Sequence, residues 1–197
     1  MKEKEEKKKF TAAKTYPVPY ELEEMNENFM VSNNNSYSKP SIDKVINQGI
    51  RFHKKGNIQE AIKYYQYLIN QRSNDPRVFS NYATVLREIG NLHEAEVLAR
   101  KAINLNPHLA NTHANLGNIL RDLGQLKDAE FSYRKAIEIN PDYAIAYCNL
   151  GNILNDLGNL KEAELSQRKA IELKPDFANA HSNLGNILKD LGNLEEA

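Results

Sequence analysis

The residues best able to do chemistry in this 197-residue chain are asparagines that return at a fixed spacing. One series repeats every 34 residues: Asn47, Asn81, Asn115, Asn149 and Asn183. A second series follows the last three of these by three residues: Asn118, Asn152 and Asn186. A carboxamide offers one acceptor and two donors, so it can bond both the N–H and the C=O of an extended peptide. Such a ladder predicts weak binding of many sequences through their main chain.

Catalytic and metal-binding sets are not indicated. None of the five histidines lies within four residues of another histidine or of Cys148, so the spacing predicts no metal site. No base is close in sequence to activate Cys148 as a nucleophile. The segment LGNILRDLG lacks the Lys and Ser/Thr of a phosphate-binding loop. These patterns predict a binding protein with no cofactor and no catalytic centre within the 197 residues.

The balance of charge and the lack of long apolar segments indicate which partners the chain can bind. The chain has 26 basic and 26 acidic residues, whereas binding to nucleic acid usually needs a basic surplus on one face. No run of about 18 apolar residues is present to cross a bilayer. The charged start MKEKEEKKKF is not followed by an apolar signal core. We therefore predict a cytoplasmic protein whose partner is a protein or peptide, with no nucleic acid and no membrane.

Glycine indicates the elements that must position the asparagines. One series recurs every 34 residues, which is the period of a helix-turn-helix unit: Gly56, Gly90, Gly124, Gly158 and Gly192. Apolar residues between these glycines recur at spacings of three and four, as on one helix face: Leu116, Ile119, Leu120 and Leu123. Each glycine is expected to end a first helix in the left-handed conformation. Asp75 and Pro76 predict a helix start, as N-cap and first helical residue.

Small residues also recur inside the predicted first helices: Gly49, Ala83, Gly117, Gly151 and Gly185. Glycine within a helix costs about 1 kcal/mol relative to alanine, so its return needs a compensating cause. We expect two helix backbones to approach each other closely at these positions. A bulky residue in place of Gly151 should then destabilise the array strongly.

The segment GNILRDLGQLKDAEFSYRKAIEINPDYA resembles the tetratricopeptide repeat, with its small residue, turn glycine, alanines, aromatic and closing proline. This resemblance implies an all-α fold, a right-handed solenoid of antiparallel helical hairpins whose first helices line the concave side. With position 1 at Ile42, the units are 42–75 (divergent), 76–109, 110–143, 144–177 and a partial unit, 178–197. Residues 1–41 have the composition of a largely disordered tail.

The NLGN steps at 115–118, 149–152 and 183–186 resemble those of the superhelical arm of the protein O-linked N-acetylglucosamine transferases. That resemblance implies that the position-6 asparagines hold the main chain of a bound segment: Asn81, Asn115, Asn149 and Asn183. Asn47 is less secure, because Ile46 and Ile50 would make that part of the groove apolar. The outward faces of the second helices contain no such asparagines, which argues against a compositional bias. Stitching of one repeat to the next by these amides stays open as an alternative.

Other first-helix positions carry further predictions. Position 5 contains no lysine, so a clamp for a terminal carboxylate is not predicted: Ile46, Ser80, Ala114, Cys148 and Ser182. Position 4 holds His113 and His181 where the family usually has an aromatic residue, so both are expected to pack in the core. Charges of alternating sign at positions 12 and 13 favour a solvated, mutually screened rim.

The last unit stops at Ala197, its position 20. A solenoid needs a polar cap over its final apolar face. We therefore expect incomplete cover for four residues: Leu184, Ile187, Leu188 and Leu191. Either the sequence is part of a longer protein, or this end pairs with a second copy. A longer parent with a glycosyltransferase or sulfotransferase domain would make the array a substrate-targeting arm, which is the alternative function.

Overall fold

The computed structural model describes residues 40–192. Almost all of the predicted disordered tail, residues 1–41, lies outside this range, as do residues 193–197 of the partial fifth unit. All regular secondary structure in this range is α-helical, which confirms the predicted fold class. None of the described helices combines the length and apolar character needed to cross a bilayer.

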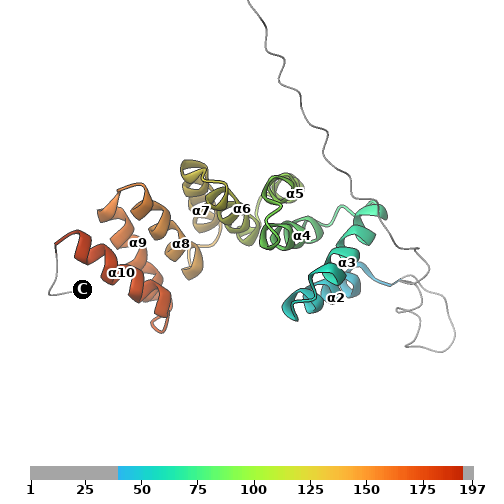
Figure 1. Ribbon diagram of the computed structural model, residues 1–197, viewed down its shortest axis with the longest axis horizontal. Helices are drawn as coiled ribbons and strands as arrows, with labels where there is room; N and C mark the ends of the chain where they lie inside the picture. Colours follow the sequence, from blue (N-terminus) through green and yellow to red (C-terminus); the bar gives the residue numbers. More distant parts are fainter. Residues whose placement is uncertain (1–39, 193–197) are drawn as a thin grey trace, which may run out of the picture. The chain divides into compact units, whose positions relative to one another are not determined.

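The described residues form nine helices that follow the 34-residue period. The first helices of the units are α2 (Ile42–Lys54), α4 (Pro76–Glu88), α6 (Ala110–Asp122), α8 (Ala144–Asp156) and α10 (Ala178–Asp190). The second helices are α3 (Ile58–Asn70), α5 (Leu92–Leu105), α7 (Leu126–Ile139) and α9 (Leu160–Leu173). Each helix packs against the next one in the chain, as in a solenoid (Figure 1).

The first and second helices differ in their neighbours. First helices of adjacent units contact one another, α2 with α4, α4 with α6, α6 with α8 and α8 with α10. No second helix of the described units contacts the second helix of the next unit. Elements on the inner side of a curved stack lie closer together than those outside. The first helices therefore form the inner face of the stack, as the resemblance to the tetratricopeptide repeat implies.

The turn between the two helices of a unit is set by glycine. Gly124 has φ +76°, a left-handed conformation that side chains disfavour. Its N–H donates to the carbonyl of Arg121 at 2.9 Å, and the N–H of Gln125 donates to the carbonyl of Leu120 at 2.8 Å. These bonds close the end of α6 as a C-terminal cap. The predicted role of the turn glycines is confirmed.

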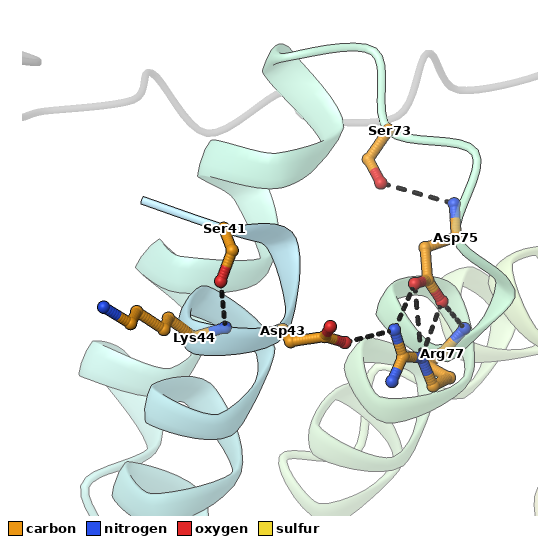
Figure 2. Close-up of polar contacts among 6 residues, drawn as sticks. All are labelled: Ser41, Asp43, Lys44, Ser73, Asp75 and Arg77. Carbon is orange, nitrogen blue, oxygen red and sulfur yellow. Dashed lines mark hydrogen bonds and ion pairs between the residues drawn. The ribbon is translucent and has the colours of Figure 1, made fainter. Parts of the chain in front are cut away.

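Helix α4 begins with the predicted N-cap. The carboxylate of Asp75 accepts from the backbone N–H of Arg77 at 2.9 Å (Figure 2). Pro76 is the first residue of the helix. The Arg77 guanidinium donates to Asp75 at 2.6 Å and to Asp43 of α2 at 2.6 Å, so it joins two successive first helices. Arg77 and Asp43 are more than half exposed, so this link contributes little free energy. The cap itself is the stabilising element.

Replacing Asp75 tests that cap. Asp75→Ala should lower the free energy of unfolding by about 1 kcal/mol, because a helix donor loses its acceptor, whereas Asp75→Asn should keep most of the cap. The hydrogen bond from Arg77 lowers the pKa of Asp75 below its ordinary value of 3.8. The ionised carboxylate therefore stabilises the fold above pH 3.8, and this contribution disappears as the pH falls through the lowered value. Urea denaturation measures the free energy of unfolding of the wild type and of Asp75→Asn between pH 7 and pH 2.5. The Asp75 contribution should decrease over this range in the wild type and be absent from Asp75→Asn.

The small residues inside the first helices have a different partner from the one predicted. A Cβ on Gly117 would lie 2.8–3.0 Å from ring atoms of Tyr133 in α7, and one on Gly151 would lie 2.5 Å from Nε2 of Gln167 in α9. The expected close approach of two backbones is therefore wrong. What fills the space above each glycine is the position-24 side chain of the second helix, and both side chains are fully buried.

The apolar face of α10 is better covered than the sequence suggested. Ile187 and Leu188 are each only 2 % exposed, because α10 packs on α9 and α8. Leu184 and Leu191 are half-buried. The expectation of incomplete cover is thus wrong for the first two residues and holds for the other two. Self-association through this end stays a prediction.

Candidate functional site

The predicted asparagines lie along the first helices and keep partial access to solvent. Six of them are half-buried: Asn81, Asn115, Asn118, Asn149, Asn152 and Asn183. Asn47 and Asn186 are exposed. Apart from Asn47, which lies on α2, the predicted asparagines lie on the four first helices α4, α6, α8 and α10.

The position-6 asparagines bond to the preceding unit. The Nδ2 of Asn115 donates to Oγ of Ser80 at 3.2 Å, that of Asn149 to Oδ1 of Asn118 at 3.3 Å, and that of Asn183 to Sγ of Cys148 at 3.6 Å. Asn81 has no such partner in the described structure, and position 5 of the unit before it is the apolar Ile46. Stitching between repeats, the alternative left open by the sequence, is therefore present in three places.

The position-9 asparagines bond within their own unit. Oδ1 of Asn118 accepts from the hydroxyl of Tyr133 at 2.8 Å, and Oδ1 of Asn152 accepts from Nε2 of Gln167 at 2.9 Å. Burial raises the pKa of Tyr133, so this phenol stays a protonated donor. Sequence reasoning missed this link. Its signal is the combination of glycine at position 8, asparagine at position 9 and a long polar side chain at position 24.

The first unit shows what happens when that combination is incomplete. It has Gly49 at position 8 and Tyr65 at position 24, but Ile50 in place of asparagine at position 9. The Tyr65 hydroxyl is buried and has no hydrogen-bond partner among the described residues. A buried hydroxyl without a partner costs about 1–3 kcal/mol. Position 9 is therefore a structural acceptor as well as a groove residue.

The asparagines of position 6 and of position 9 retain different hydrogen-bonding groups for a ligand. A carboxamide that donates one N–H retains a second N–H and its oxygen, so Asn115, Asn149 and Asn183 can both donate to and accept from a ligand. Asn118 and Asn152 already use their oxygen inside the fold, so they mainly offer N–H donors. The bonds also hold each amide in one orientation.

One hollow on the inner face brings three predicted residues together. It has a volume of about 450 Å³ and lies between α8 and α10. Its lining is Ile145, Cys148, Asn149, Asn152, Phe177, Asn179, Ser182 and Asn183. None of these described lining residues carries a charge. The sequence predicted Asn149, Asn152 and Asn183 here, and missed Ile145, Phe177, Asn179 and Ser182.

A second hollow of about 420 Å³ lies among α7, α8 and α9 and contains none of the predicted asparagines. Its lining includes Arg134 and Glu162, which form an ion pair of 2.7 Å between adjacent second helices. These two charges already neutralise each other. We therefore place the candidate site in the first hollow.

Cys148 lies at the floor of the candidate site as a packed thiol. It is 3 % exposed and packs with Ala170 and Ala180. Burial raises its pKa, and the hydrogen bond from Asn183 only partly opposes this. The protonated thiol is a poor nucleophile. The sequence-based interpretation of Cys148 as a residue that fills a small groove position agrees with this geometry.

The histidines of position 4 do not behave as predicted. His181 is exposed and His113 half-buried, so neither is a core residue. Each ring instead contacts a proline carbonyl of the preceding junction. Nε2 of His113 lies 2.9 Å from the carbonyl of Pro107, and Nε2 of His181 lies 2.8 Å from the carbonyl of Pro175. An imidazole N–H in the matching tautomer can donate to this carbonyl. Within residues 40–192, no cluster of His, Cys, Asp and Glu could hold a metal ion.

The charged rim is paired across units. His53 lies 2.8 Å from Glu88 of the next unit, and Arg87 lies 2.6 Å from Asp122 of the next unit. Position 12 of one unit thus contacts position 13 of its successor. This pairing supports the interpretation of the rim as mutually screened rather than selective for a charged ligand.

Comparisons with known proteins agree with this architecture. A tetratricopeptide repeat model matches residues 76–109, and a TPR repeat model matches residues 117–158 and 151–192. No curated protein sequence matches the chain significantly.

Solved structures with the same fold cover most of the chain. MamA from Desulfovibrio magneticus RS-1 is 22% identical over 78% of this chain and 87% of its own, with a TM-score of 0.69. YrrB is 23% identical over 77% of this chain and 78% of its own, with a TM-score of 0.63. The first TPR domain of Spaghetti (RPAP3) is 23% identical over 61% of this chain and 95% of its own, with a TM-score of 0.59. At these identities the likeness shows the fold alone. Together with the matched repeats and the helix pairs, it establishes that the chain belongs to the tetratricopeptide repeat family.

Proposed function

We propose that this chain is a protein-interaction module that binds extended peptide segments on its first helices by their main chain. One observation carries the proposal. Asn149, Asn152 and Asn183 line a single hollow of about 450 Å³, and none of its described lining residues is charged. A site rich in amides and free of charge suits the uncharged N–H and C=O groups of a peptide backbone.

The orientation of the amides favours binding. The bonds from Asn149 to Asn118 and from Asn183 to Cys148 already order these side chains before a ligand arrives. Ordering a flexible side chain on binding costs about 0.5–1.5 kcal/mol, so amides that are fixed in advance avoid part of this cost. Stitching of repeats and binding of a ligand are therefore compatible uses of the same side chain.

The spacing of the units suits an extended ligand. Packed helices lie about 8–10 Å apart, and an extended chain advances about 3.3 Å per residue, so one unit matches roughly three ligand residues. A ligand that contacts Asn115, Asn149 and Asn183 would then be about nine residues long. Main-chain recognition of this kind accepts many sequences.

Two structural relatives support peptides as the class of ligand. YrrB is described as having an unusual peptide-binding site, and the Spaghetti domain was solved with an HSP90 peptide. In this chain position 5 has no lysine, so binding through a terminal carboxylate is not part of the proposal. The second hypothesis, a substrate-targeting arm of a larger transferase, would use the same asparagines and stays a prediction.

The double variant Asn115→Ala with Asn149→Ala tests the proposal. Each substitution removes up to two ligand hydrogen bonds worth about 0.5–1.5 kcal/mol each, so affinity should fall about thirtyfold. The probe is a nine-residue peptide of alternating Thr and Ser with capped ends, titrated in two-dimensional ¹H–¹⁵N NMR spectra. Such spectra measure weak affinities and also report whether the fold is intact.

Asn104→Ala is the matched control, because Asn104 is an exposed asparagine on the second helix α5. It should leave the affinity unchanged. Equal affinity of the double variant and the wild type, with an intact fold, would refute the asparagine ladder.

A further inference from the structure

Position 2 of the first helix is exposed in every unit, and one unit differs from the others. The five residues at this position are Asp43, Arg77, Asn111, Ile145 and Asn179. Four are polar, as expected for a solvated position, and Ile145 is a large apolar residue with 51 % of its surface exposed. An isolated exposed isoleucine is ordinary. This one, however, lines the hollow that also contains the asparagines.

A second apolar side chain extends the same side of the hollow. Phe177 is the N-cap residue of α10 and is half-buried. It lines the hollow together with Ile145, and the nearly buried Cys148 contributes to the same lining. The hollow therefore combines three apolar groups with amide and hydroxyl groups of Asn149, Asn179, Ser182 and Asn183.

The chemistry of the lining determines which ligand side chain the hollow can accept. Among residues 40–192 no lining residue is charged, so a charged ligand side chain would lose hydration there without gaining a partner from them. Lys174 lies beside Phe177, with its Nζ 5.2 Å from the centre of the ring, and is not among the described lining residues. An aliphatic side chain would instead cover exposed apolar surface of Ile145 and Phe177.

We infer that the hollow between α8 and α10 is a specificity subsite that takes one aliphatic side chain of the bound peptide. The inference rests on the proposed function, since the main chain of the same peptide would be held by Asn149 and Asn183. The peptide is then recognised in two ways. The asparagines bind the backbone of any extended segment, and the hollow between α8 and α10 selects Val, Ile, Leu or Met at one ligand position.

A host–guest peptide series tests this inference. The host is the nine-residue Thr/Ser peptide with one central guest residue, Ala, Leu, Asp or Lys, and the readout is affinity from NMR titration. Leu has three more carbons than Ala, and half-burying them is worth about tenfold in affinity. The wild type should therefore bind the Leu guest about tenfold more tightly than the Ala guest. The Asp and Lys guests should bind no more tightly than Ala.

Two variants separate the subsite from general apolar contact. Ile145→Asn places at position 2 the residue found in the units before and after it, Asn111 and Asn179. It should reduce the Leu preference, taken as the ratio of the Leu-guest and Ala-guest affinities of the same variant, to about twofold. Leu165→Asn, on the second helix α9 where Leu165 is 66 % exposed, should leave the tenfold preference unchanged.

The outcomes distinguish this inference from the function on which it rests. Equal affinities for the Leu and Ala guests in the wild type, with clear binding of both, would overturn the subsite and leave the ladder standing. A Leu preference that stays about tenfold in Ile145→Asn, or a preference for the Asp guest, would also overturn it. Binding of no guest peptide by the wild type would overturn both.

Discussion

Gly117→Ala is expected to destabilise the chain by about 1–3 kcal/mol, although alanine is the better helix former. The new Cβ would meet ring atoms of Tyr133 at 2.8–3.0 Å, which is closer than packed atoms allow. Tyr133 cannot easily move away, because its ring is fully buried and its hydroxyl is bonded to Asn118. Urea denaturation measures the change in the free energy of unfolding.

The sign of this effect should reverse when the ring is absent. Tyr133→Ala alone should cost about 3–5 kcal/mol, through a cavity and a lost hydrogen bond. In that background Gly117→Ala should stabilise by up to about 1 kcal/mol, because only the helix propensity remains. The second unit already contains this compensated pair, Ala83 and Ala99, both fully buried. If Gly117→Ala has the same effect with and without the Tyr133 ring, the packing account is wrong.

Much of the fold could be predicted because local chemistry determines it. A residue at φ +76° in a helix-ending turn is nearly always glycine, so the series containing Gly124 located the turns directly. Asp75 followed by proline located the start of α4 for a similar reason, since few residue pairs suit an N-cap and first turn. Both signals depend on the backbone of adjacent residues only.

The partners of these elements across the fold could not be predicted in the same way. The sequence indicated that Gly117 needs space, but not that Tyr133, sixteen residues later, fills it. His181 was assigned to the core by its position in the repeat, while the structure places it at the surface against the carbonyl of Pro175. Such contacts depend on side-chain rotamers and on the angle between units.

In the candidate site, too, the sequence predicted some features and not others. The 34-residue spacing was sufficient to place Asn149 and Asn183 on one surface, because the period of the chain is the period of the stack. The direction of each amide was not predictable, since it follows from contacts with the preceding unit, such as Cys148. Phe177 was missed because it lies at the junction before α10, outside the first-helix pattern used to find the groove.

The main-chain basis of binding predicts a large effect of changing the ligand backbone alone. N-methylation at alternate residues of the nine-residue Thr/Ser peptide removes N–H donors and adds bulk, while every side chain is retained. Loss of several bonds worth about 0.5–1.5 kcal/mol each should weaken binding about a hundredfold. Side-chain recognition would not require this loss, because the same hydroxyl and methyl groups remain available.

The affinity of the wild type for the N-methylated and the unmodified peptide, compared by NMR titration under one set of conditions, tests the central claim most directly. The asparagine ladder predicts that the N-methylated peptide binds about a hundredfold more weakly, with chemical-shift changes from the unmodified peptide centred on Asn115, Asn149 and Asn183. Equal affinities of the two peptides would contradict it.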